Sequence, residues 1–267
     1  MELLIVNILI VASRIWIIVT GIFVLAQILK DNSIIDIFYG PIFFVVAFLF
    51  LIITKTTSLL PAIITMCIGL WAVRLGGRLL IKNFGKPEDA RYVAWREEWS
   101  KKGHWYFVLR SYLQINILQG FVILLILLPF IISTTTNAFS TPFVIAGVIV
   151  FLFGLAYETI ADVQLDRYIA RKIAGTETAV LMTKGLFNYC RRPNYFGESM
   201  IWWGQAVMVL SLPFGLLGLL SPIVITFVVV KLTGPLLENQ FLKKYPEEYR
   251  QYMATTNYFI PGPKKKT

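Results

Sequence analysis

Long runs of apolar residues constrain this chain more than any other feature of its sequence. Seven segments approach the length of about 20 residues that a helix needs to cross the hydrocarbon core of a bilayer. They are residues 3–29, 34–54, 59–81, 112–132, 141–157, 199–212 and 214–232. None alternates apolar and polar residues as the strands of a membrane barrel do. The sequence therefore predicts an all-α, polytopic membrane protein with seven transmembrane helices, the last two joined as a tight hairpin.

The composition excludes several other classes of protein. Of the 267 residues, 57% are hydrophobic and 15% are charged, whereas soluble domains carry about 25% charged residues. A soluble enzyme, a disordered chain and a nucleic-acid-binding module are therefore excluded, and membrane lipids are the expected surroundings. The two cysteines, Cys67 and Cys190, form no disulfide framework or C-x-x-C site, and His104 is the single histidine. We therefore expect no metal site.

Basic residues gather in loops that fall on one side of the predicted bundle. Segments 82–111 and 158–198 and the tail after residue 232 hold most of the 25 lysines and arginines. Because cytoplasmic loops of membrane proteins are enriched in these residues, the N-terminus is expected outside and the C-terminus in the cytoplasm. We expect the inner membrane of a bacterium, or the endoplasmic reticulum membrane of a eukaryote, with the active site facing the cytoplasm.

Ionisable residues inside the apolar segments point to a site, because they are costly within a membrane. Asp36 and Arg74 lie in the second and third segments, and Glu198 directly precedes the sixth, all toward the ends that the predicted orientation places near the cytoplasm. Amide side chains at the start of the fourth segment lie at the same depth. The sequence therefore predicts a polar cavity that opens to the cytoplasm. Arg14, in the middle of the first segment, has no such explanation.

Two arginines, Arg191 and Arg192, precede Pro193 in the loop before the sixth segment. Proline suits the first turn of a helix, so we expect a helix to begin there. Free N–H groups at a helix N-terminus attract anions, and guanidinium groups bind phosphate and carboxylate. The pair therefore predicts an anion site, with contact to lipid headgroups as the alternative. Asn194 and Glu198, one turn apart, are expected to point along one face into the bundle.

A second polar pattern continues the fifth apolar segment. Glu158, Asp162 and Asp166 are spaced four residues apart, so in a helix they share one face. Such carboxylates can hold a divalent metal or accept hydrogen bonds from a ribose or an amide. The alternative is a solvated face neutralised by Arg167 and Arg171.

These motifs together resemble the steroid 5α-reductase family, and most closely its bacterial-type branch. The segments that carry the resemblance are 33–40, 71–75, 88–96, 185–198 and 237–261. The resemblance implies a single membrane-embedded reductase domain, in which residues 1–132 form the substrate side and residues 133–267 the cofactor side. It also implies NADPH bound from the cytoplasm and hydride transfer to the β-carbon of an α,β-unsaturated ketone in a steroid-like or other lipidic substrate.

The resemblance implies roles for individual residues as well. Short polar side chains that would hold the nicotinamide and ribose are Asp162, Asn194 and Glu198, and the arginines that would face phosphates are Arg171, Arg191 and Arg192. The whole expected cofactor-binding set is Glu158, Asp162, Arg171, Lys172, Tyr189, Arg191, Arg192, Asn194, Tyr195, Glu198, Glu238 and Tyr245. The expected catalytic set is Asp36, Tyr39, Trp71 and Arg74.

The chain departs from the family on the substrate side. Steroid reductases pair a buried Glu on the second helix with a Tyr on the third to polarise the substrate ketone, whereas this chain offers Asp36 and has Trp71 three residues before Arg74. A tryptophan donates one hydrogen bond but does not transfer a proton as a tyrosine does. Asp36 would have to be a neutral acid, with a raised pKa, to assist at a carbonyl oxygen.

Other functions remain open at this point. The arginine–proline motif and the C-terminal segment also resemble isoprenylcysteine methyltransferases, which bind S-adenosylmethionine and carry His where this chain has Arg192. A non-catalytic lipid-binding membrane protein is the third alternative. Titration with NADPH and with S-adenosylmethionine separates the three.

Overall fold

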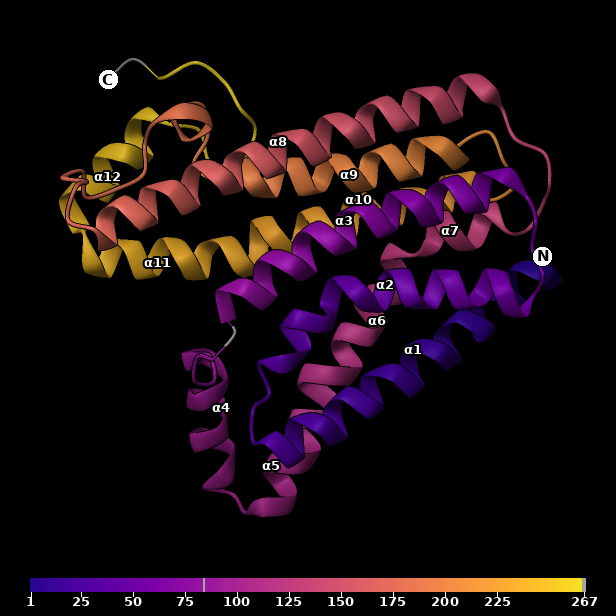
Figure 1. The fold of residues 1–267 in the computed structure, drawn as a ribbon, viewed down its shortest axis with the longest axis horizontal. Helices are drawn as coiled ribbons and strands as arrows, with labels where there is room; N and C mark the ends of the chain where they lie inside the picture. Colours follow the sequence, from indigo (N-terminus) through magenta and orange to yellow (C-terminus); the bar gives the residue numbers. More distant parts are fainter. Residues whose placement is uncertain (84, 266–267) are drawn as a thin grey trace. The chain divides into compact units, whose positions relative to one another are not determined.

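The computed structural model describes residues 1–83 and 85–265, and the regular elements among them are all helical. A single isolated bridge pairs Cys190 with Asn257. The chain divides into two compact units (Figure 1), which we call the N-terminal unit (Met1–Phe139 with Ser211–Leu217) and the C-terminal unit (Ser140–Leu210 with Gly218–Thr267).

The N-terminal unit contains three long helices followed by a hairpin and an interrupted helix. Its elements are α1 (Glu2–Leu29), α2 (Ile34–Ile53), α3 (Leu59–Asn83), α4 (Ala90–Ser100), α5 (His104–Arg110), the π-helix η1 (Ser111–Ile117), α6 (Leu118–Ile126) and α7 (Leu128–Ser133). Small residues let α2 and α3 pack closely. A Cβ atom on Gly76 would lie 3.1 Å from Pro41, and one on Gly40 would lie 3.3 Å from the backbone of Ala72. Close approach at small residues is how helices associate where lipid removes the hydrophobic driving force.

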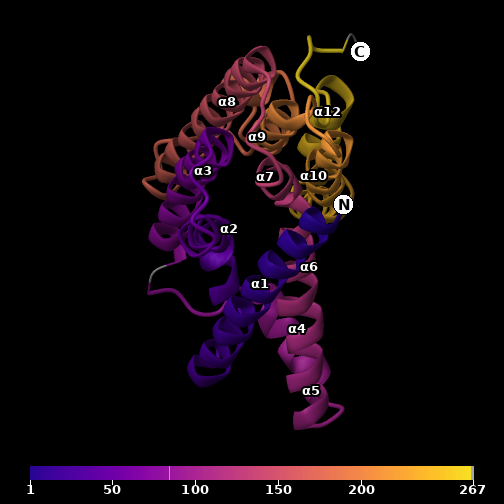
Figure 2. The ribbon, with the colours of Figure 1, turned by 90° about the vertical axis from the view of Figure 1, so that its right-hand side faces the viewer.

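The C-terminal unit is built on two long helices and a kinked one. Its elements are α8 (Thr141–Ile173), the 3-10 turn η2 (Gly185–Asn188), α9 (Pro193–Val209), α10 (Leu220–Phe227), the π-helix η4 (Val228–Thr233), α11 (Gly234–Lys244) and α12 (Pro246–Thr255). The turn η3 (Gly215–Leu219) precedes α10, and the boundary between the two units falls within it. Both ribbon views show α8 and α9 side by side (Figures 1 and 2). The helix α8 continues unbroken from its apolar part through Glu158, Asp162 and Asp166, as the sequence predicted.

Four glycines bring α8 and α9 into backbone contact. A Cβ atom on Gly204 would lie 2.6 Å from the carbonyl oxygen of Gly147, and one on Gly154 would lie 2.7 Å from that of Gly197. The paired glycines run in opposite directions along the two helices, which are therefore antiparallel. No larger side chain fits at these positions, so the backbones of α8 and α9 touch over two turns.

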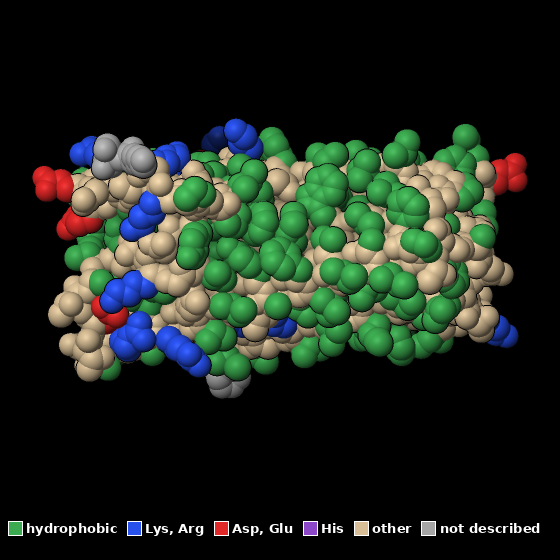
Figure 3. Space-filling view, turned by 90° about the horizontal axis from the view of Figure 1, so that it is seen from above, with side chains coloured by type: hydrophobic (Ala, Val, Ile, Leu, Met, Phe, Trp, Pro, Cys, Tyr) green, Lys and Arg blue, Asp and Glu red, His purple; other side chains and the backbone are tan. Residues whose placement is uncertain are grey.

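The predicted membrane architecture is confirmed in part. Within residues 1–83 and 85–265, six helices are long and apolar enough to cross a membrane, which is the character of an integral membrane protein. They are Glu2–Leu29, Ile34–Ile53, Leu59–Asn83, His104–Ile126, Thr141–Ile173 and Gly215–Lys244. The remaining predicted span, the sixth segment (residues 199–212), corresponds to α9, which has 17 residues and is shorter than these six. Apolar side chains cover much of the surface in Figure 3. Val73 of α3, for example, is 75% accessible.

The contact between α8 and α9 predicts that a glycine within it tolerates substitution by alanine much less well than a glycine outside it. In Gly197→Ala the new Cβ would lie 2.6 Å from the backbone nitrogen of Glu158, so the helices have to separate. We expect a loss of about 2 kcal/mol or more in the free energy of unfolding, as for an overpacked core. The measurement is the midpoint of thermal unfolding in detergent micelles, followed by tryptophan fluorescence. Gly21→Ala is the matched control, because nothing lies within 4 Å of its new Cβ; equal effects of the two variants would contradict the contact.

Candidate functional site

The loop before α9 places two arginines at the start of a helix. The helix begins at Pro193, as the sequence predicted, and Arg192 is its N-cap residue. Proline has no backbone N–H to leave unpaired, and its fixed φ suits the first turn. Arg191 and Arg192 are consecutive, yet their side chains have different surroundings.

Arg191 is held by the protein itself. Its Nε donates to Oε1 of Glu238 at 2.8 Å, and its Nη1 donates to the backbone oxygen of Thr256 at 2.7 Å. Only 7% of the Arg191 side chain and 14% of the Glu238 side chain are accessible, so this ion pair is largely shielded from water. The hydroxyl of Tyr249 donates to the same Glu238 oxygen at 3.2 Å. Arg191 therefore ties the start of α9 to α11 and to the end of α12.

Arg192 presents an open hydrogen-bonding edge. Its guanidinium lies 5.9 Å from the ring centroid of Tyr195 and 5.6 Å from that of Phe241. Its Nε and Nη2 are buried, and neither has a hydrogen-bond partner among the described residues, which is the sense in which the edge is open. These two N–H groups leave the same edge of the guanidinium plane, which is the edge that binds carboxylate or phosphate through two parallel hydrogen bonds. The adjoining helix N-terminus adds positive potential. We call Arg192, with Tyr195 and Phe241, the anion site.

The carboxylates of α8 differ in burial along the helix. Glu158 and Asp162 are each 4% accessible, whereas Asp166 is exposed. The backbone of Glu158 lies against Gly197 of α9, so the contact between the two helices fixes the position of Glu158 along α9. Among the described residues no group of three histidine, cysteine or acidic side chains converges in a way that could hold a metal ion. The two buried carboxylates are instead suited to accept hydrogen bonds.

Other residues of the expected cofactor set hold the loop after α8. Nε of Arg171 lies 3.2 Å from Oε2 of Glu177, and Nζ of Lys172 donates to the backbone oxygen of Ala179 at 2.8 Å. Tyr189 is half exposed and lines an open hollow. Of the remainder of the set, Asn194 and Glu198 are half-buried in the first turns of α9, and Tyr245 is the residue between α11 and α12.

A buried thiol lies beside the arginines. Cys190 is 0% accessible, and its backbone pairs with that of Asn257. Burial raises the pKa of the Cys190 thiol to about 11, so the group is protonated and unreactive at neutral pH. The sequence placed this cysteine in a polar loop, and nothing in its local pattern indicated burial.

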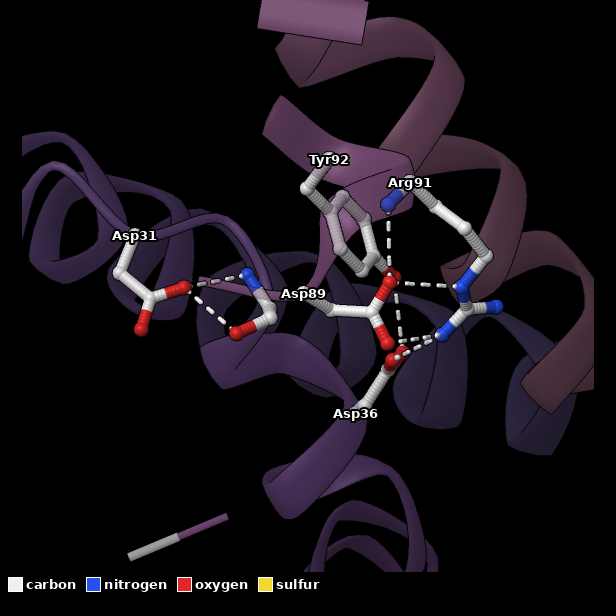
Figure 4. A network of polar contacts seen from close by, with 6 residues as sticks. Asp31, Asp36, Asp89, Arg91 and Tyr92 are labelled. Atoms are coloured by element: carbon white, nitrogen blue, oxygen red, sulfur yellow. Dashed lines mark hydrogen bonds and ion pairs between the residues drawn. The ribbon is translucent and has the colours of Figure 1, made fainter. Parts of the chain in front are cut away.

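In the N-terminal unit, Asp36 belongs to a polar network that joins α2 to α4 (Figure 4). The hydroxyl of Tyr92 donates to Oδ1 of Asp36 at 2.8 Å, and Nη2 of Arg91 lies 3.1 Å from Oδ2. Nε of Arg91 donates to Asp89, which caps α4. Burial and the nearby Asp36 raise the pKa of Tyr92, so its hydroxyl stays protonated and donates. Burial would raise the pKa of Asp89, but the hydrogen bonds and charge of Arg91 outweigh it and lower that pKa.

The other expected catalytic residues lie on facing parts of α2 and α3. The rings of Tyr39 and Trp71 pack edge to face with centroids 6.5 Å apart, and Phe43 lies 5.2 Å from each. Trp71 is fully buried, and Arg74 is half-buried one turn further along α3. The structure thus brings Tyr39 and Trp71 together. Tyr92 and Arg91 were missed from the sequence, because their distance of about 55 residues from Asp36 gives no local signal.

Removal of the Glu238 carboxylate should destabilise the C-terminal unit. In Glu238→Leu the buried Arg191 loses its counter-charge, and an uncompensated buried charge costs about 3–5 kcal/mol. The midpoint of thermal unfolding in micelles should therefore fall by several degrees. Glu247→Leu is the control, because Glu247 is exposed on the neighbouring α12; a similar fall in both variants would show that the ion pair contributes nothing.

Comparison with known proteins gives one match. The model of a family described as a protein of unknown function (DUF1295) matches residues 22–256. No curated protein and no solved structure matches the chain. The matched residues include the whole of α2 to α12, and with them Asp36, Arg191 and Arg192. Because the match extends over most of its length, the chain belongs to the DUF1295 family.

Proposed function

We propose that this chain is a membrane-embedded, NADPH-dependent reductase of the C=C bond of an α,β-unsaturated ketone in a steroid-like or other lipidic substrate. The observation that carries the proposal is the open edge of Arg192, whose Nε and Nη2 are buried and find no partner among the described residues. A buried guanidinium edge is costly unless an acceptor binds it. A phosphate of a dinucleotide is an acceptor of the right charge and geometry.

The donor set of the C-terminal unit suits the rest of such a cofactor. NADPH carries phosphates, which a guanidinium edge binds, and neutral hydroxyl and amide groups, which donate hydrogen bonds to carboxylates. Glu158 and Asp162, each 4% accessible, would accept hydrogen bonds from ribose hydroxyls or the carboxamide. When bound, NADPH would supply a hydride to the β-carbon, and with a proton from water at the α-carbon the products would be the saturated ketone and NADP⁺.

The membrane setting supports an apolar substrate. The proposal includes seven spans, with α9 as the short one, the N-terminus outside, the C-terminus in the cytoplasm and the cofactor entering from the cytoplasm. It assigns the ketone to the N-terminal unit, where Asp36, Tyr39, Trp71 and Arg74 are the proposed catalytic residues. Tyr92 would be a positioning residue, because its hydroxyl donates to Asp36 at 2.8 Å.

Cofactor titration tests the proposal directly. The purified chain in micelles should bind NADPH, as measured by quenching of tryptophan fluorescence, and should oxidise NADPH when a lipidic enone is added. In Arg192→Met the loss of a two-point charged contact should weaken NADPH binding by about 10- to 100-fold. Arg167→Met is the matched control, because Arg167 is exposed on α8, and its affinity for NADPH should stay unchanged.

The alternatives give different results in the same titration. Binding of S-adenosylmethionine in place of NADPH would indicate a methyltransferase, since its carboxylate can also bind the Arg192 edge. Binding of neither would indicate a non-catalytic membrane protein. Either result would overturn the reductase.

Asp36→Asn separates the substrate side from the cofactor side. The substitution keeps the shape of the side chain but replaces the ionisable carboxyl group with a neutral amide. We expect it to abolish turnover of NADPH with an enone and to leave NADPH affinity unchanged. Asp31→Asn, in the turn between α1 and α2, should keep turnover, since Asp31 accepts its hydrogen bonds from the backbone N–H and the hydroxyl of Ser33 in the same turn. Full turnover by Asp36→Asn would exclude a catalytic role for this carboxyl.

A further inference from the structure

The segment that follows α12 is bound to the loop that carries the arginines. We call residues Thr256–Gly262 the C-terminal strap. The backbone N–H of Arg191 donates to Asn257 at 2.8 Å, and that of Gly262 donates to Tyr189 at 3.1 Å. The side chain of Arg191 adds its bond to the backbone oxygen of Thr256 at 2.7 Å. The strap therefore fixes both the backbone and the side chain of Arg191.

Tyr258 connects this strap to the kinked helix of the same unit. Its hydroxyl donates to the backbone oxygen of Val230 at 2.9 Å, within the π-helix η4. A π-helix interrupts the regular ladder of backbone hydrogen bonds, which makes its carbonyl groups available to outside donors. A side chain on Gly234 would overlap the Tyr258 hydroxyl, so a glycine leaves the space that the tyrosine fills. The Tyr258 ring also lies 5.3 Å from the Arg191 guanidinium.

We propose that Tyr258 is a positioning residue of the anion site, acting on Arg192 through the strap and Arg191. The inference rests on the proposed function only in taking the Arg192 edge as an anion-binding group. The two arginines are adjacent in the chain, so a fixed Arg191 limits where the Arg192 side chain can point. A free Arg191 would let the N-cap residue, whose φ of −132° is not helical, adopt other conformations. Tyr258 is the point at which this chain of contacts is anchored to a membrane helix.

The first measurement uses the cysteine beneath the strap and needs no ligand. Cys190 is fully buried and pairs with Asn257, so N-ethylmaleimide should reach it only when the strap opens. Tyr258→Phe removes the hydroxyl and keeps the ring, and should speed alkylation of Cys190 by about tenfold, the effect of one lost hydrogen bond. The buried Cys67 of α3 is the internal reference, and its rate should not change.

A matched substitution controls for the loss of any tyrosine hydroxyl. The hydroxyl of Tyr168 also donates to a backbone oxygen in the same unit, that of Val180 at 2.8 Å, and neither residue belongs to the strap. Tyr168→Phe should leave the Cys190 alkylation rate unchanged. An unchanged rate in Tyr258→Phe, or an equal increase in both variants, would overturn the anchoring role.

The second measurement separates positioning from mere stability. Binding of NADPH and of inorganic pyrophosphate is measured for the wild-type chain, Tyr258→Phe, Arg192→Met and the double variant. If Tyr258 acts through Arg192, Tyr258→Phe weakens binding of the anion by about tenfold, and has little further effect once Arg192 is replaced. Additive effects, or an unchanged affinity in Tyr258→Phe, would overturn the proposal.

The two probes distinguish this inference from the reductase. Pyrophosphate binding with the expected coupling, in the absence of NADPH binding, would support the positioning role of Tyr258 and overturn the reductase. Failure of both probes to bind would overturn both, because the Arg192 edge would then bind no anion of this class.

Discussion

The direct contact between the backbones of α8 and α9 is the constraint on which the C-terminal unit depends. In a membrane, two apolar helices gain little by leaving the lipid, so close packing has to hold them together. Gly147 and Gly154 on α8 meet Gly204 and Gly197 on α9, and no side chain separates them. The contact places the backbone of Glu158 against Gly197, near the start of α9, and fixes the direction in which α9 runs. The position of the arginine loop at that beginning follows from it.

The two arginines show how the same residue type serves different purposes at adjacent positions. Arg191 is satisfied by Glu238 and by the backbone oxygens of Met253 and Thr256, which makes it part of the scaffold. Arg192 has aromatic rings beside it, and its Nε and Nη2 have no hydrogen-bond partner among the described residues, which is why the proposed function assigns the anion to it. A buried charge that is fully paired contributes little net stability, but the loss of one partner is expensive. The pairing of Arg191 therefore supports the geometry of the site more than it stabilises the fold.

Much of the fold could be predicted from the sequence, because apolar runs and proline act locally. The first three membrane-length helices match the predicted segments closely, and α9 begins at Pro193. The other three overlap their predicted segments but extend into the polar sequence beside them. The length of α9 could not be inferred in the same way, since its polar first turns are part of the helix and its apolar part is short. The glycine contact had a visible signal, a spacing of seven residues on both helices, but the partner of each glycine depends on the antiparallel register.

The candidate site was predictable in residue type and not in pairing. The sequence indicated an anion site at Arg191 and Arg192, and it could not indicate that Glu238, 47 residues away, engages only the first of them. The same limit applies to Asp36, whose partners Arg91 and Tyr92 come from α4. Such pairings depend on three-dimensional packing, and a single sequence contains no local pattern for them.

The two π-helices illustrate how this chain satisfies backbone groups inside an apolar environment. A widened turn interrupts the ladder of helix hydrogen bonds, and a carbonyl group without a donor is costly in lipid. In η1 the side-chain amide of Asn116 donates to the backbone oxygen of Ser111 at 3.4 Å, from within the same helix. In η4 the donor to Val230 is Tyr258, which comes from the C-terminal strap. The donor in η4 comes from a residue far along the chain, so this hydrogen bond couples a membrane helix to the loop that carries Arg192. The donor in η1 comes from the same helix, so its effect is local.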